Sequence, residues 1–134
     1  MNRTALVLVI FAVVFSTLAV VSYTQKSATW DEPQHVLRGC LGWRGDNRMD
    51  PEHPPFLRLW AALPVAFDKS LKLDTAVIDQ ISPTDWVGMG QFEYAQHYLY
   101  KENDADRLLY RERFMIVLLG ILLGILLYSW TNEW

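Results

Sequence analysis

Two uncharged apolar segments, one near each end of the chain, constrain the fold more than any other feature of the sequence. Residues 4–23 read TALVLVIFAVVFSTLAVVSY and residues 114–130 read FMIVLLGILLGILLYSW, with no Asp, Glu, Lys or Arg in either. A helix needs about 20 apolar residues, within a range of about 17 to 25, to cross the hydrocarbon core of a bilayer. The sequence therefore predicts two transmembrane helices.

The residues between these segments, 24–113, have the opposite character. They contain all three His, all six Pro and every one of the 12 Lys and Arg except Arg3. Both charge signs are mixed, the net charge is only −3, and no basic run points to nucleic acid. The single cysteine, Cys40, excludes an internal disulfide. The predicted fold is an all-α membrane protein in which two transmembrane helices flank one large, mostly helical loop.

The first apolar segment has a second interpretation, a cleaved signal peptide. Its apolar core is longer than the usual 7 to 15 residues, and AVVS at 19–22 is a poor cleavage site, so an uncleaved anchor is favoured. Orientation stays open. Arg107, Arg111 and Arg113 would hold the loop in the cytoplasm, but loops longer than about 60 residues are translocated largely regardless of charge. Gly120 and Gly124 indicate close packing against another helix, either a neighbour or a second copy.

Acidic residues and histidines gather in residues 31–53. The first group is Asp31, Glu32 and His35, and the second is Asp50, Glu52 and His53. Asp-Glu-Pro at 31–33 predicts a helix start, because acids and proline favour the first turn, and the helix should run to about residue 43. Residues three and four apart share a helix face, so the first group should lie together.

Three further segments are predicted to be structured. A mostly apolar helix from Pro55 to about residue 63 carries only Arg58 as a charge and is ended or kinked by Pro64; it lies either at the bilayer surface or in the loop core. Residues 68–81 suggest an amphipathic turn or strand. The sequence SPTD at 82–85 is typical of a helix cap, followed by a helix to about residue 100, and Asp104 should cap a last helix that continues into the second apolar segment.

Three interpretations of the central acidic stretch compete. In the first, its side chains are solvated or cap helices, for which Asp31 and Asp50 are well placed. In the second, they bind a divalent cation, although no compact ligand motif is present. Alternatively, Asp31 or Glu32 serves as a general base toward a hydroxyl, with His53 and Arg58 stabilising a phosphate leaving group.

The order of these features resembles the amino-terminal end of the GT-C-type membrane glycosyltransferases, which include protein O-mannosyltransferases and aminoarabinose transferases. Asp31-Glu32 is similar to the acidic pair that opens their first large loop. EHPPFLR at 52–58 resembles a His-Pro-Pro-Leu-Gly-Lys type of motif, with Arg58 at the basic position. The run YLYKENDADR at 98–107 and Arg113 also look like bacterial members.

The resemblance implies transfer of a sugar from a polyprenyl-phosphate donor to a hydroxyl of a lipid, glycan or protein, with inversion, by an enzyme of the plasma membrane whose loop is extracytoplasmic. Asp31 would be the base and Glu32 its supporting carboxylate, and the substrate-binding residues would be His35, Glu52, His53 and Arg58. No residue is assigned to a metal, although a divalent cation is compatible with the stretch.

Members of that family have many more spanning helices. The chain is therefore expected to be an amino-terminal fragment that has no activity by itself. The alternative is a non-catalytic two-span membrane protein whose loop binds or scaffolds a partner.

Overall fold

The structure is a computed structural model that describes residues 3–47, 49, 54–80 and 90–132. These residues form helices and connecting segments, with no β-strand among them. The elements in chain order are α1 (Arg3–Thr24), α2 (Glu32–Trp43), α3 (Phe56–Ala66), α4 (Thr75–Gln80), α6 (Gly90–His97), the π-helix η1 (Tyr98–Glu102) and α7 (Ala105–Asn132). The all-α prediction is confirmed for this part of the chain.

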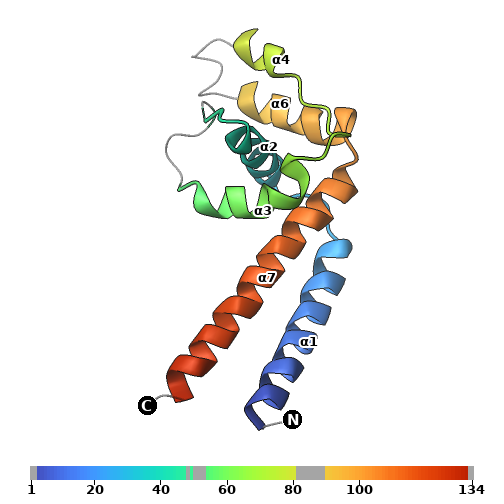
Figure 1. The fold of residues 1–134 in the computed structure, drawn as a ribbon. Helices are drawn as coiled ribbons and strands as arrows, with labels where there is room; N and C mark the ends of the chain where they lie inside the picture. The colour runs from blue at the N-terminus through green and yellow to red at the C-terminus, as the bar shows by residue number, and fades with distance from the viewer. Residues whose placement is uncertain (1–2, 48, 50–53, 81–89, 133–134) are drawn as a thin grey trace.

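Helices α1 and α7 form a two-helix stem, and the other helices gather at one end of it (Figure 1). Both stem helices are long and apolar enough to cross a membrane. The start of α1 and the end of α7 both lie at the end of the stem away from the other helices. Helix α7 begins at Ala105, well before its apolar part, as predicted from the continuity of residues 105–113 with the second apolar segment.

Two glycines of α7 face α1. A Cβ atom on Gly120 would lie 2.6 Å from Cζ of Phe15, and one on Gly124 would overlap the ring of Phe11. The lack of a side chain at Gly120 and Gly124 therefore leaves the space that the two phenylalanine rings occupy. Of the two alternatives for the glycine pair, this arrangement is the packing of neighbouring helices within one chain.

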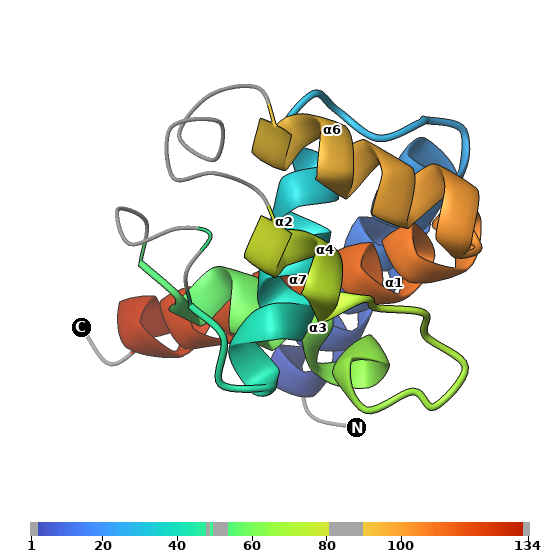
Figure 2. The same ribbon diagram turned by 90° about the horizontal axis from the view of Figure 1, so that it is seen from above.

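Helix α2 lies at the centre of the helices above the stem (Figure 2). Its apolar side faces the core, where four side chains are all buried: Val36, Leu37, Cys40 and Leu41. Gly39 allows the closest approach to α3, since a Cβ there would lie 2.6 Å from both Cβ of Ala62 and the carbonyl oxygen of Arg58. The bounds predicted for α2 also agree with the structure.

Helix α3 continues through Pro64 to Ala66, so the prediction that it ends near residue 63 is wrong. Proline removes only one backbone hydrogen bond, and Pro64 lies so near the end that packing of Val65 and Ala66 holds the last turn. The indole N–H of Trp60 donates to the carbonyl oxygen of Met115 at 2.7 Å. This bond places α3 beside the first apolar turn of α7.

Residues 75–80 form the short helix α4, so the prediction of a turn or strand over 68–81 is wrong for them. The carboxylate of Asp74 accepts a hydrogen bond from the N–H of Ala76 at 2.9 Å, which supports the first turn, and Ile78 is buried. The predicted cap at 82–85 lies outside the described residues. The helix expected behind it is α6 followed by η1, and Tyr98 and Leu99 of η1 lie in the core.

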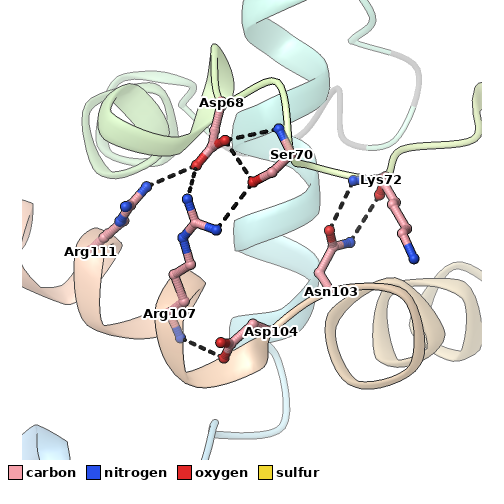
Figure 3. Close-up of polar contacts among 7 residues, drawn as sticks. All are labelled: Asp68, Ser70, Lys72, Asn103, Asp104, Arg107 and Arg111. Carbon is pink, nitrogen blue, oxygen red and sulfur yellow. Dashed lines mark hydrogen bonds and ion pairs between the residues drawn. The ribbon is translucent and has the colours of Figure 1, made fainter.

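A polar network anchors the segment between α3 and α4 to the start of α7 (Figure 3). Arg107 and Arg111 both donate to Oδ2 of Asp68, at 2.6 and 3.0 Å, while the hydroxyl of Ser70 donates to Oδ1 at 2.7 Å. Asp104 caps α7, as predicted, by accepting the N–H of Arg107 at 3.0 Å. The network fixes the helices between α1 and α7, which we call the loop helices, relative to the stem.

Candidate functional site

Asp31 occupies the position immediately before α2. Its side chain makes no capping hydrogen bond, so the capping interpretation is wrong for this residue. Its carboxylate instead accepts a hydrogen bond from the hydroxyl of Thr29 at 3.1 Å and lies 3.6 Å from Nε2 of His35. The predicted pairing of Asp31 with His35 on one side of the helix is confirmed.

Asp31 is open to solvent, with 63% of its side chain exposed. A hydrogen bond from its own backbone N–H is the largest influence and lowers the pKa of the carboxyl, as do the Thr29 hydroxyl and His35, whereas desolvation acts in the opposite direction. The group is thus an ionised carboxylate at neutral pH. It is accessible to a hydroxyl that approaches the start of α2.

Glu32 is held in a different way. Arg113 of α7 donates to both of its carboxylate oxygens, from Nε to Oε1 at 2.7 Å and from Nη2 to Oε2 at 2.6 Å. The backbone N–H of Thr29 adds a bond to Oε2 at 3.1 Å. A bidentate guanidinium–carboxylate pair fixes both direction and position, so Glu32 is rigidly placed and its charge is balanced.

Arg113 also joins the end of α1 to α7. Its guanidinium donates to the carbonyl oxygens of Tyr23, Lys26 and Ser27 at 2.8, 2.9 and 3.0 Å. These carbonyls belong to the last turn of α1 and the segment that follows it. One side chain therefore connects both stem helices to the first turn of α2.

A cavity of about 270 Å³ lies between α2, α3 and α7. Three of the predicted site residues line it: Glu32, His35 and Arg58. Asp31 does not line it, although its neighbour His35 does. Glu52 and His53, like Asp50, lie outside the described residues. The remaining lining side chains are Val36, Leu57, Ala61, Glu112, Arg113 and Ile116.

The cavity lies at the level where α7 becomes apolar. Its wall includes Ile116, two residues into the uncharged segment, and Leu57 of α3; these side chains are 45% and 56% exposed. The carboxyl and guanidinium groups that line it come from α2 (Glu32), α3 (Arg58) and the turn of α7 before its uncharged segment (Glu112 and Arg113). A ligand there would meet both charged groups and apolar side chains.

Glu112 is the acidic lining residue that the sequence analysis did not mention. It is only 6% exposed, and its Oε1 atom accepts no hydrogen bond from any described residue. A signal was present, because Glu112 follows the buried residues Leu108 and Leu109 at spacings of four and three, which place it on the same helix face. An acidic residue on an apolar helix face is a functional candidate.

Across residues 3–47, 49, 54–80 and 90–132, no group of three or more His, Cys, Asp or Glu side chains is arranged to hold a metal ion. Half of the acidic stretch considered for a cation, Asp50 with Glu52 and His53, falls outside these ranges. The metal interpretation therefore gains no support from the described first half, Asp31, Glu32 and His35.

Comparison of the chain with known protein families, with curated proteins and with solved structures finds no match. The resemblance to membrane glycosyltransferases therefore depends on the short motifs and their order along the chain, and the function is argued from the cavity.

Proposed function

We propose that this chain is part of an integral, multi-pass glycosyltransferase of the plasma membrane, which transfers a sugar from a polyprenyl-phosphate donor to an acceptor hydroxyl. The observation that carries the proposal is the cavity, where carboxylates and guanidinium groups meet apolar side chains beside the start of an apolar helix segment. A lipid-linked sugar has the matching order of groups, with a hydrophobic chain, a phosphate and a polar head. In this proposal α2, α3, α4, α6 and η1 are extracytoplasmic.

The residues have distinct roles in this proposal. Arg58, which is 8% exposed, binds the phosphate with its guanidinium, since arginine suits the geometry of phosphate oxygens. Asp31, ionised and exposed, accepts the proton of the acceptor hydroxyl. The Glu32–Arg113 pair keeps the first turn of α2 in place, and His35 lies between Asp31 and the cavity.

Asp31→Asn in the complete enzyme tests the assignment of the base. The substitution keeps size and hydrogen bonding but removes the proton acceptor, so sugar transfer should fall by about 10²-fold or more while the melting temperature stays within a few degrees. Transfer is measured with a radiolabelled donor. Asp106→Asn, at an exposed acid in the first turn of α7, is the matched control. Wild-type transfer by Asp31→Asn would remove Asp31 from this role.

The purified 134-residue chain is expected to show no transfer by itself, because the family it resembles uses many more spanning helices. Turnover by this chain alone would contradict that expectation.

The second candidate is a non-catalytic membrane protein whose loop helices bind a partner. Arg113 favours this candidate, because the five hydrogen bonds that its guanidinium donates all stabilise the junction of stem and loop helices. These bonds have a structural role. The two candidates differ in the effect of Arg58→Gln. A scaffold should keep its partner and its abundance, whereas the proposed enzyme should lose donor binding.

A further inference from the structure

Glu112 is a buried acid that the proposed transfer reaction does not use. The residue is 6% exposed, and its Oε1 atom has less than 1 Å² of accessible surface and no hydrogen-bond partner among the described residues. An ionised carboxylate removed from water is costly unless a cation or several donors compensate it, whereas a protonated carboxyl avoids most of that cost. The protonation state of Glu112 therefore depends on the groups that surround it.

The cationic groups near Glu112 do not balance a negative charge there. The guanidinium of Arg113 donates to both carboxylate oxygens of Glu32 and to three backbone carbonyls. Arg58 of α3 and His35 of α2 line the same cavity. The influences on the pKa of the Glu112 carboxyl nevertheless all raise it, from 4.5 to about 8, with burial first and the Glu32 carboxylate second.

Two further ionisable groups lie near Glu112, the Cys40 thiol of α2 and the Tyr98 hydroxyl of η1. Both residues are 0% exposed. Burial, followed by the Glu112 carboxylate, raises the pKa of Cys40 to about 12, and burial is also the largest cause that raises the pKa of Tyr98. Both groups are uncharged at neutral pH, so neither is a counter-ion for Glu112.

Glu112 lies in the part of α7 that packs against the loop helices, before the uncharged segment 114–130. In this region α7 contacts α2, α3 and η1, and Leu108 and Leu109, one turn earlier, belong to the same core cluster as Cys40 and Tyr98. Water could solvate a charge on Glu112 only if these contacts opened. Ionisation of Glu112 and loosening of α7 are therefore coupled.

We propose that Glu112 is a pH-sensitive switch, which carries a proton at neutral pH and loosens α7 from α2 and η1 when it loses that proton. The folded-state pKa is raised above 4.5, so the stability that the protonated group contributes is fully present below pH 4.5 and is lost as the pH rises through about 8. The inference depends on the burial and the neighbours of Glu112 alone, and it goes beyond sugar transfer.

Infrared spectroscopy of the intact chain in dodecyl maltoside, a detergent without carbonyl groups, tests the protonation. Among the described residues Glu112 is the one acid that is buried, so a protonated carboxyl at neutral pH is assigned to it even in the wild type. Its C=O stretch should shift in heavy water, disappear with a midpoint near pH 8, and be absent from Glu112→Gln. Glu93→Gln, at an exposed acid in the first turn of α6, should keep the band. Absence of the band at neutral pH, or a midpoint near 4.5, would overturn the inference.

Labelling of Cys40 tests the loosening. Cys40 is the single cysteine of the chain and is buried, so its reaction with a small thiol reagent reports opening of the contacts between α7, α2 and η1. Alkaline pH speeds the labelling of any thiol because the thiolate reacts, and Glu112→Gln shares this increase. The ratio of the wild-type rate to the Glu112→Gln rate should therefore rise severalfold from about pH 7 to about pH 9, while the ratio of wild type to Glu93→Gln stays constant. A constant ratio for Glu112→Gln would overturn the switch.

Discussion

Arg113 shows how a single side chain can determine the geometry of a junction. Its guanidinium uses a planar set of donors to reach Glu32 in two places and three carbonyl oxygens at the end of α1. Only 13% of the Arg113 side chain is exposed, so water does little to replace these bonds. The first turn of α2, which follows directly after Asp31, is positioned through this residue.

Arg113→Lys should therefore destabilise the protein although the charge is kept. An ammonium group cannot reproduce the bidentate pair or reach all three carbonyls, and the expected loss is about 2–4 kcal/mol in the free energy of unfolding. Thermal denaturation in detergent micelles measures it. Arg44→Lys, at the exposed end of α2, is the control. A loss of stability no larger than that of the control would show that the junction is held by packing instead.

Asp68 predicts a pH dependence of stability. Hydrogen bonds from the Ser70 hydroxyl and N–H, followed by the nearby Arg107 and Arg111, lower the pKa of Asp68 from 3.8 to about 2. A lowered folded-state pKa gives stability that is present above pH 3.8 and is lost as the pH falls through about 2. Wild type should be more stable than Asp68→Asn near neutral pH, and the difference should shrink as the pH falls from about 4 to 2. A difference that persists unchanged at pH 2 would contradict the ionic account.

At the scale of elements, α3 links the loop helices to the stem. Its buried side, with Ala61, Ala62 and Val65, packs in the core, and its other side leaves Phe56 and Leu63 61% and 39% exposed. Packing in the core is thus confirmed for the buried side, whereas a position at the bilayer surface stays a prediction for the exposed side. The bond from Trp60 to Met115 holds the helix at the start of the apolar part of α7.

We expect the exposed side of α3 to lie in the lipid interface. Spin labels at Phe56→Cys and Leu63→Cys should be accessible to molecular oxygen, which concentrates in lipid, and protected from a water-soluble nickel complex. Val77→Cys on α4, 37% exposed and away from the stem, is the matched control and should show the reverse. Equal access of the nickel complex to the α3 and α4 labels would place α3 in water.

The first and last residues of α2 could be predicted because its start and its apolar side are both local signals in the sequence. Asp-Glu-Pro marks the first turn, and the buried residues recur at helical spacing. The short helix α4 has only one buried side chain, Ile78, and hence almost no periodicity to detect. The end of α3 was misplaced because the proline rule is local, whereas the burial of Val65 depends on tertiary packing.

Part of the candidate site could be predicted for the same reason. Glu32, His35 and Arg58 belong to two short segments close in sequence, and folding brings them to one cavity. Glu112 and Arg113 lie far along the chain, where Arg113 was considered for its charge and for the family resemblance, and Glu112 was not considered. Their role follows from the antiparallel return of α7 beside α1, which no local pattern specifies.

At the scale of the whole molecule, the cavity lies where the stem contacts the loop helices. This position of the cavity is the basis of the proposed function. Both stem helices have the length and apolarity to cross a bilayer, and the charged cavity residues lie at one end of them. In the proposed function, an amphiphile in the membrane reaches the cavity past Ile116 and Leu57, two exposed side chains that line it. The account therefore requires that the cavity bind a lipid-linked sugar directly.

Native mass spectrometry of the chain in nanodiscs, titrated with a polyprenyl-phosphate-linked sugar, tests that requirement. The account predicts one bound donor per chain and an affinity that falls about tenfold or more in Arg58→Gln, because a charge-assisted bond to phosphate is lost, with no change in Arg44→Gln. Absence of binding, or equal affinity for the two variants, would contradict it.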